Sequence, residues 1–545
     1  MNSLYKKNIR VLMLEPASQQ KLREKAVPNR NLGPAYIIGA LQRHGIEVDY
    51  LDCTVGQSGR NLKETFFNRE EMENGNLRYG MNSSELYEIF AKYDIIATSS
   101  IFSMQTRMHF EVAKIARKVS KDLGKKILVV SGGVNSRALR EHFLSNGFDI
   151  IALGAGEATI VQIVDEFSSS KPDYTKVERI AFRNDGKTVI TSGHPRKGTK
   201  FIDHLPFPAT ESMPLDVYAN LGIPHWGLPM VGKKFASLQT ARGCQDKCTF
   251  CHISLEKKES DLVGDIGFLK LFSKERIGQD VDRLVKLGIT RIYIEDDNLF
   301  FNKKRLYELA PYLKRDGLTY SAVNGANLRF LVKRVNSHYE VDHDFIEMLA
   351  GFGLDEFNLP FETASKDMMT KYATAKYDPD EMSPFGILDA VKKNGMRTIA
   401  SFLIGFRDEN WESVKKTKDF AKILVERGLD QVGFSIPVPY PGSLDFEHEM
   451  SKPEQKKNFN ENLLNYTDNM HCRSKPLFHT NVPGKDLVSA VRDFWEELTP
   501  TEIKNSLSAL HVDAKSPSLL TKTKGPRGGK EYKNDTFRPR KPLIK

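Results

Sequence analysis

Short apolar runs alternate with helical patterns over the first part of the chain. Five of these runs predict strands, at Val11–Leu14, Ile46–Leu51, Ile95–Ser99, Ile127–Ser131 and Asp149–Leu153. Helical patterns fall between them, for example over residues 35–43 and 108–119. Alternation of strands and helices is typical of a parallel sheet covered by helices. Residues 1–165 are therefore expected to form a doubly wound, Rossmann-like α/β domain.

A second series of the same kind begins near residue 235. Its predicted strands are Phe235–Gln239, Arg291–Glu295, Thr319–Val323, Glu356–Phe361, Thr398–Ile404 and Gln431–Pro437. Six β/α units fit a partial barrel better than a complete eight-stranded one. Residues 235–445 are therefore predicted to form a partial (β/α)6 barrel, with catalytic groups at the C-terminal ends of its strands.

Three further segments connect or follow the two α/β regions. Residues 166–234 are predicted to be a linker, with a hairpin turn at residues 184–186 and a Pro-rich run at 205–209. Residues 446–514 are predicted to be mostly helical. Residues 515–545 are rich in Gly, Pro and basic residues, which indicates a flexible tail.

Composition and charge narrow the possible classes of protein. Hydrophobic residues make up 40% and charged residues 28% of the 545 residues, as in ordinary globular proteins. No apolar run is long enough for a membrane helix, and residues 1–10 are too polar for a signal peptide. We therefore expect a cytoplasmic enzyme with no membrane partner. The net charge of +10 lies mainly in the tail, so a nucleic-acid partner is not expected.

Three of the five cysteines form one tight motif just after the first barrel strand. Cys244, Cys248 and Cys251 have C-x3-C-x2-C spacing, which can place three thiolates around one four-iron cluster. Such clusters usually take four cysteines, so three would leave one iron free to bind a substrate. The alternative is a zinc site completed by His252, but that side chain directly follows Cys251 and no second ligand pair lies nearby.

Small and polar residues end several predicted strands of the first domain. In an open α/β sheet, ligands bind at the carboxyl ends of strands, where small residues let a cofactor approach the backbone. The candidate cofactor contacts at these strand ends are Ser99, Ser100, Gly132, Gly133, Gly154, Gly156 and Glu157.

The cysteine motif, its position and the preceding α/β domain together resemble the cobalamin-binding radical-SAM family, over residues 8–445. The resemblance implies a [4Fe-4S] cluster on the three cysteines, S-adenosylmethionine (SAM) at the free iron, and an external electron donor. It also implies cobalamin at the first domain, where the matching loop adds Ile101, Phe102 and Ser103 to the expected contacts. No Asp-x-His-x-x-Gly occurs in residues 1–165, so cobalamin is expected without a histidine axial ligand.

The resemblance assigns further SAM contacts to the ends of the barrel strands. Asp296 or Asp297 would bind the amino group, the alternative role being a helix N-cap. Glu362 would accept hydrogen bonds from the ribose hydroxyls. Phe250 and Gly405 would lie near the adenine, although a structural turn explains such a glycine almost as well.

Within this family the chain resembles the C-methyltransferase branch. Residues 76–80 and 99–103 are locally most similar to the fosfomycin-type phosphonate methylases. This implies methylation of an unactivated carbon through a 5′-deoxyadenosyl radical and methylcobalamin. The alternative is an enzyme with the same domains that uses the radical for cyclisation, rearrangement or oxidation. The substrate is expected to be a small molecule or a peptide.

Overall fold

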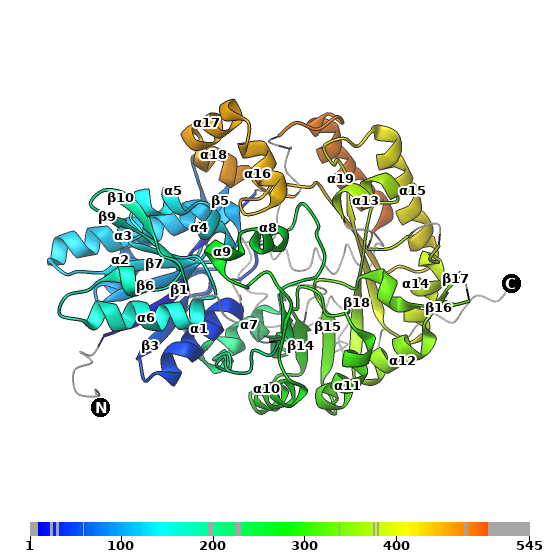
Figure 1. The fold of residues 1–545 in the computed structure, drawn as a ribbon, viewed down its shortest axis with the longest axis horizontal. Helices are drawn as coiled ribbons and strands as arrows, with labels where there is room; N and C mark the ends of the chain where they lie inside the picture. Colours follow the sequence, from blue (N-terminus) through cyan, green and yellow to red (C-terminus); the bar gives the residue numbers. More distant parts are fainter. Residues whose placement is uncertain are drawn as a thin grey trace.

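Two mainly parallel sheets, one in each half of the chain, organise the computed structural model (Figure 1). It describes residues 9–21, 26–28, 32–57, 59–193, 200–223, 230, 232–336, 338–373, 376–378, 381–472, 476 and 478–499. The predicted tail, 515–545, and residues 500–514 of the predicted helical segment lie outside these residues. No helix in the described part of the chain is both long and apolar enough to cross a membrane.

The first sheet has the order β10-β9-β8-β7-β6-β1-β3. Its parallel strands agree with the five predicted ones to within two residues at either end; they are β1 (Val11–Glu15), β3 (Val48–Asp52), β6 (Ile95–Ser99), β7 (Leu128–Gly132) and β8 (Ile150–Ala152). The prediction of a doubly wound α/β domain is confirmed.

Alternation along β1 shows how this sheet is covered on both faces. Val11 and Met13 share a core with α1 (Leu32–Arg43) and α6 (Gly156–Ser168). Leu12 and Leu14 share another core with α2 (Ser83–Phe90) and α3 (Thr106–Leu123). Because successive side chains of a strand point to opposite faces, each apolar residue of β1 meets a helix.

The predicted linker 166–234 is more than a connection. Its first part forms β9 (Ile180–Asn184) and β10 (Lys187–Ile190), an antiparallel pair that extends the first sheet beside β8. Asp185 and Gly186 between these strands have φ of 48° and 77°, as a two-residue hairpin turn with both φ values positive requires, and the predicted turn is confirmed. Sequence reasoning missed the two strands because β9 has only three buried residues and β10 none.

The Pro-rich run at 205–209 packs between the two halves. Arg276 of α10 (Lys274–Lys286) donates hydrogen bonds to the carbonyl groups of Asp203, Leu205 and Pro206. Its guanidinium also lies 3.5 Å from the centroid of the Phe207 ring. The run is therefore held by specific contacts.

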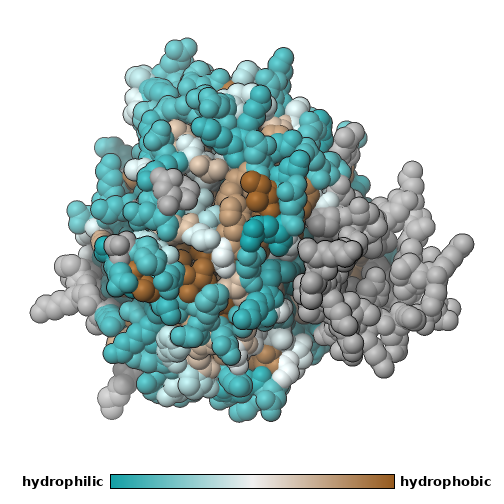
Figure 2. All heavy atoms as spheres, turned by 90° about the vertical axis from the view of Figure 1, so that its right-hand side faces the viewer, coloured by the Kyte–Doolittle hydropathy of each residue, from teal (hydrophilic) through white to brown (hydrophobic). Residues whose placement is uncertain are grey.

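The second sheet is parallel throughout, with its strands in chain order, as a partial barrel requires. All six predicted strands are confirmed, as β11 (Phe235–Leu238), β14 (Arg291–Ile294), β15 (Thr319–Ala322), β18 (Leu354–Glu362), β19 (Arg397–Leu403) and β20 (Gln431–Ser435). The outer helices include α11 (Lys303–Leu313), α12 (His343–Gly351), α14 (Pro384–Lys393) and α15 (Trp411–Glu426). The face of the molecule opposite the first sheet is mainly hydrophilic, with small apolar areas (Figure 2).

The helices after the barrel divide between the two halves (Figure 1). The helices α16 (Leu444–Met450), α17 (Pro453–Glu461) and α18 (Leu463–Asn469) contribute Phe446, Phe459 and Tyr466 to the core of the first domain. The last described helix, α19 (Gly484–Leu498), packs on the barrel, where the Phe494 ring lies 5.3 Å from that of Phe434 in β20.

The C-terminal strand ends of the two sheets face each other. Gly442, in the loop after β20, has φ 92°, and a Cβ there would lie 2.6 Å from Val134 Cγ2 in α4 (Val134–Ala138), directly after β7. Glu157 at the start of α6 forms a 2.6 Å ion pair with Arg242 in β12 (Ala241–Arg242), two residues before Cys244. Both regions with candidate chemistry therefore open toward one space.

Candidate active site between the two sheets

The three motif cysteines lie in the loop between β12 and α8 (His252–Lys258). Gly243 begins the loop with φ 76°, and a Cβ there would lie 2.3 Å from the Phe268 carbonyl oxygen. Lys257 of α8 donates to the carbonyl of Cys244 at 3.0 Å, and Asp246 within the loop accepts from Arg329 at 2.9 Å. These contacts fix the loop backbone on both sides.

The thiols share a small, poorly solvated volume. Cys248 is buried, and Cys244 and Cys251 are partly buried; none of the three forms a disulfide. Burial, with smaller contributions from the neighbouring Cys248, Asp297 and Cys244, raises the pKa of Cys251 to about 12. Burial also raises the pKa of Cys244. The thiolate form in this pocket needs a positive centre, which iron supplies, so the donor set fits a cluster.

His252 does not join the thiols. Its Nδ1 lies 3.1 Å from Glu256 Oε1 on the next turn of α8, and Glu256 pairs with Arg137 of α4. Within the described ranges, no group of three or more His, Cys, Asp or Glu side chains could hold a metal ion. A single zinc ion needs its ligands within about 2.3 Å, whereas a cubane takes one thiolate on each of three irons. This arrangement favours the cluster over zinc.

The two carboxylates after β14 have different surroundings. Both oxygens of Asp296 accept from Thr240, one from its N–H at 2.5 Å and one from its hydroxyl. Burial raises the pKa of Asp296 to about 6, although Arg305 and Thr240 lower it. Asp297 instead accepts from the Gly243 N–H at 2.7 Å, one residue before Cys244. Asp297 is thus the carboxylate in contact with the cysteine loop.

Glu362 ends β18 with φ 61°, a left-handed conformation that is costly for a non-glycine residue. It pairs with Lys376, a residue that sequence reasoning missed. Burial lowers the pKa of Lys376, but Glu362 and the thiols of Cys248 and Cys251 outweigh this and raise it. A partly buried ammonium thus lies within electrostatic reach of two motif thiols, and no sequence motif marks this lysine.

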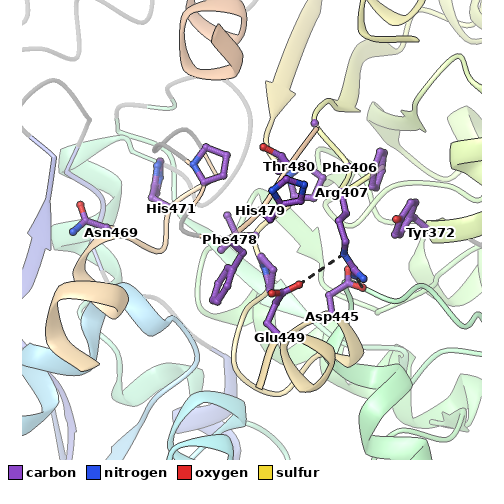
Figure 3. A pocket seen from close by; sticks show the side chains of 15 residues that line it. Tyr372, Phe406, Arg407, Asp445, Glu449, Asn469, His471, Phe478, His479 and Thr480 are labelled. Atoms are coloured by element: carbon purple, nitrogen blue, oxygen red, sulfur yellow. Dashed lines mark ion pairs between the residues drawn. The ribbon is translucent and has the colours of Figure 1, made fainter. Parts of the chain in front are cut away.

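A pocket of about 40 Å³ opens at the ends of β19 and β20 (Figure 3). Gly405 lines it, together with the stacked rings of Tyr372 and Phe406, 4.9 Å apart. Phe250 of the cysteine loop packs 6.5 Å from Phe406. The structure therefore brings Phe250 and Gly405 to one place. Gly405 also has a packing role, because a Cβ there would lie 2.4 Å from Leu487 Cδ1.

Charged residues that sequence reasoning missed form the other side of this pocket. Arg407 lies 3.7 Å from Asp445 and 3.8 Å from Glu449, and Figure 3 shows it directed toward these carboxylates. His471 and His479 line the same pocket from the segment after α18. They stand more than 60 residues beyond Gly405 in the sequence, so no local pattern could have joined them to it.

The ends of β6 and β7 form a compact surface of small residues. Gly133 has φ 94°, and a Cβ there would lie 2.5 Å from the Ser100 carbonyl oxygen. The Ser100 hydroxyl accepts from Asn135 at 2.9 Å, and Ser103 is also buried. Ile101 and Phe102 between them are 37% and 55% exposed. Two apolar side chains therefore project from a tightly packed turn, next to Ser99 and Gly132.

The turn after β8 is packed against other elements. A Cβ on Gly154 would lie 2.9 Å from the Val263 carbonyl oxygen, and one on Gly156 would lie 2.8 Å from Ile37 Cδ1. Glu157 is buried in its ion pair with Arg242. The small residues here allow close approach of protein to protein, and a cofactor contact at this turn stays a prediction.

Comparisons with known proteins agree with the barrel and its cysteines. The radical SAM superfamily model matches residues 238–421, which include the three motif cysteines. The chain is 27% identical over 387 residues to an uncharacterized methyltransferase of Pyrococcus horikoshii, covering 68% of this chain and 72% of that protein. It is 24% identical over 472 residues to cytidylyl-2-hydroxyethylphosphonate methyltransferase of Streptomyces wedmorensis, covering 80% of each.

The fold is similar to that of a solved radical SAM methyltransferase, TsrM of Kitasatospora setae, whose structure contains cobalamin and a [4Fe-4S] cluster. The match has a TM-score of 0.54 and 16% identity, and covers 81% of this chain and 78% of TsrM. The chain is a radical SAM enzyme, as its cysteine motif predicted.

Proposed function

We propose that this enzyme is a cobalamin-dependent radical SAM C-methyltransferase that methylates an unactivated carbon. The observation that carries the proposal is the meeting of the two strand-end surfaces, at Gly442 against Val134 and at Arg242 against Glu157. Methyl transfer from cobalamin to a substrate radical needs both cofactors to face one space. The names of relatives that are methyltransferases, one acting on a phosphonate, support the same class.

The barrel residues are proposed to hold the cluster and SAM. Cys244, Cys248 and Cys251 would ligate three irons, and the bound cluster would supply the electron that cleaves SAM. Asp297 would accept hydrogen bonds from the SAM ammonium, because it contacts the loop beside Cys244 while Asp296 is bonded to Thr240. The rings beside Gly405 offer a stacking surface for adenine.

Glu362 is proposed to bind the ribose hydroxyls of SAM. Its backbone φ of 61° directs it from the end of β18, and the ion pair with Lys376 holds the carboxylate in place. A left-handed non-glycine residue persists only where the surroundings hold it, which is common at binding sites. The strained conformation is the observation that favours a ligand contact here.

The first domain is proposed to bind cobalamin at the ends of β6 and β7. Gly132 and Gly133 let a large ring approach the backbone, and Ile101 with Phe102 offers an apolar cover for its lower face. The turn Ile101–Gln105 contains no histidine, so cobalt would carry no protein imidazole there. A weakly ligated lower face would favour the low-coordinate cobalt states that methyl transfer uses.

Anaerobic purification with iron and cobalt analysis tests the cofactor assignment directly. We expect about four iron atoms and about one cobalamin per chain, with the absorption bands of both. The matched control is Cys248→Ala, which should lose iron but keep cobalamin, since the two sites use different elements. A chain that binds the cluster but no cobalamin would favour the alternative, in which the radical drives cyclisation, rearrangement or oxidation.

A further inference from the structure

The last turn of α18 is hydrogen-bonded to residues that lie beside the turn after β6. Asp468 in α18 is only 1% exposed. Its Oδ2 accepts from Arg107 Nε at 3.0 Å, Arg107 Nη2 at 2.6 Å and Asn74 Nδ2 at 2.8 Å, and its Oδ1 accepts from Gln19 Nε2 at 2.8 Å. Four donors from three distant parts of the chain thus converge on one carboxylate.

These donors are next to the turn that exposes Ile101 and Phe102. Gln105, at the end of that turn, exchanges two 3.0 Å hydrogen bonds with the backbone of Gln19. Arg107 is in the first turn of α3, which continues directly from it. On its other side, the turn begins at Ser100, whose N–H donates to the Gly132 carbonyl at 2.8 Å. The turn is anchored at both ends, while its two central apolar side chains face outward.

Four residues after Asp468, the same segment reaches the barrel. The carbonyl of Cys472 accepts from the N–H of Ile436, the first residue after β20, at 2.7 Å. Asn469 and His471 between these anchors line the pocket beside Gly405 (Figure 3). Five residues of extended chain span at most about 18 Å, so this short segment sets the separation of its two anchors.

We propose that Asp468–Cys472 is a strap that aligns the apolar turn of the first domain with the barrel pocket, and that Asp468 is its positioning residue. The inference rests on the proposed function, because alignment matters only if a group bound at one surface reacts with a group bound at the other. Asp468 touches no reacting atom. It acts by holding Arg107 and Gln19, and through them the turn that carries Phe102.

Asp468→Asn tests the anchor with almost no change in side-chain volume. The amide replaces one acceptor with a donor, which then opposes the donors of Arg107, Asn74 or Gln19, and buried donors without an acceptor are costly. Arg107→Lys is the milder variant, since lysine keeps the charge but loses the two-pronged contact. The matched control is Asp122→Asn at the exposed end of the same helix α3, which removes a pairing with Lys118.

Hydrogen exchange of the full chain is the first measurement. Asp468→Asn should raise exchange in residues 99–107 by about tenfold or more, Arg107→Lys should raise it less, and Asp122→Asn should leave it unchanged. The strands of the barrel should keep their protection in all three variants. Unchanged exchange at 99–107 in Asp468→Asn, or an equal rise in both sheets, would overturn the strap.

The second measurement is coupling in the enzyme loaded with cluster and cobalamin. Asp468→Asn should form 5′-deoxyadenosine within about twofold of the wild-type rate, while methylated product per 5′-deoxyadenosine falls about fivefold or more. A parallel fall of both products would mean a merely structural role and would contradict the proposal. A wild-type enzyme that makes 5′-deoxyadenosine without methylation would refute the proposed function instead, and the exchange result would still decide whether the strap exists.

Discussion

The strand ends of the barrel and those of the first sheet are built from different chemistry. The barrel end holds charge in poorly solvated places around three thiols: Asp296 and Glu362 are buried, and Asp297 and Lys376 are partly buried. The first-sheet end holds glycines, serines and two exposed apolar side chains, with no charged group between Ser99 and Gln105. A charged, chelating ligand needs fixed opposite charges in a poorly solvated place, whereas a large flat ring needs space and apolar contact.

The two ends also differ in how their side chains are fixed. Carboxylates at the barrel end are held by neighbouring backbone N–H groups, such as those of Thr240 and Gly243. The turn at the first-sheet end is held at its margins, by Gln105 and Arg107, and its centre is left open. The difference predicts that substitutions at the barrel end impair SAM binding or cleavage. Substitutions at the first-sheet end should instead lower the yield of methylated product per 5′-deoxyadenosine.

The largest expected effect separates the motif cysteines from the other two. Cys244→Ala, Cys248→Ala and Cys251→Ala should each lower SAM cleavage by about 10³-fold or more, because each removes one iron ligand. Cys53→Ala and Cys472→Ala should keep it within about threefold, since Cys53 is a buried core residue and Cys472 uses only its backbone carbonyl at β20. Formation of 5′-deoxyadenosine under reducing conditions measures this, and full cleavage by any motif variant would refute the assignment.

The two regions should respond oppositely to acid. Burial lowers the pKa of His109, under β6, to about 3, below its unfolded value, so its contribution to stability is present above about pH 6.5 and is lost as the pH falls. Burial raises the pKa of Asp280, on α10, to about 6, above its unfolded value, so its contribution is present below about pH 4 and is lost as the pH rises through 6.

Urea unfolding of single variants over this pH range isolates the contribution of each group to the free energy of unfolding. Relative to wild type, His109→Gln should remove an acid-induced loss of about 5 kcal/mol, and Asp280→Asn should remove an alkaline loss of about 3 kcal/mol, at 1.36 kcal/mol per pKa unit. The same pH slope in both variants and the wild type would show that neither group is perturbed by burial.

A third prediction assigns different roles to the neighbouring carboxylates Asp296 and Asp297 of the barrel. Asp297→Asn should weaken SAM binding about 30-fold, the value of a charge-assisted hydrogen bond, with little change in stability. Asp296→Asn should instead lower the unfolding free energy by about 1–3 kcal/mol, because one of its two bonds to Thr240 would be lost. Isothermal titration and urea unfolding of both variants check this, and equal SAM affinities would contradict the assignment of Asp297.

The smallest effect belongs to the apolar turn. Phe102→Ser should weaken cobalamin binding about tenfold, because it removes apolar contact area, and should leave SAM cleavage and stability nearly unchanged. Trp411→Ser is the control, because Trp411 is also an exposed aromatic residue and starts α15 on the outside of the barrel. Cobalamin titration by absorbance measures the change, and equal affinities for Phe102→Ser and wild type would show that the turn does not cover the cofactor.

Electron paramagnetic resonance of the bound cob(II)alamin sharpens the same point. With no histidine in Ile101–Gln105, the spectrum should lack nitrogen superhyperfine splitting from an axial imidazole. Such splitting would refute the proposal for the lower face of cobalt.

Strands and the cysteine loop could be predicted from sequence because their signals are local. Apolar runs such as Ile95–Ser99 and Arg291–Ile294 are long and fully or nearly fully buried, and the C-x3-C-x2-C spacing is confined to eight residues. The edge pair β9 and β10 lacked that signal, since exposed edge strands need no apolar alternation.

Residues brought together over long distances could not be predicted. Lys376 reaches Glu362 from beyond α13 (Lys366–Tyr372), and Asp468 reaches Arg107 across 361 positions. Their pairing depends on how helices pack on the two sheets, which no single-sequence pattern encodes. Glu157 is a similar case, because its place after a glycine-rich turn predicts a ligand contact, which stays a prediction, but does not reveal its ion pair with Arg242.

Transfer of an isotopically labelled methyl group is the most direct test of the central claim. The enzyme, loaded with cluster and cobalamin and reduced anaerobically, would receive SAM with a trideuterated methyl group and a candidate phosphonate substrate. We expect a product heavier by the labelled methyl, formed together with about one 5′-deoxyadenosine per product and only when cobalamin is present. Formation of 5′-deoxyadenosine with a product that carries no label, or labelled product without cobalamin, would contradict the claim.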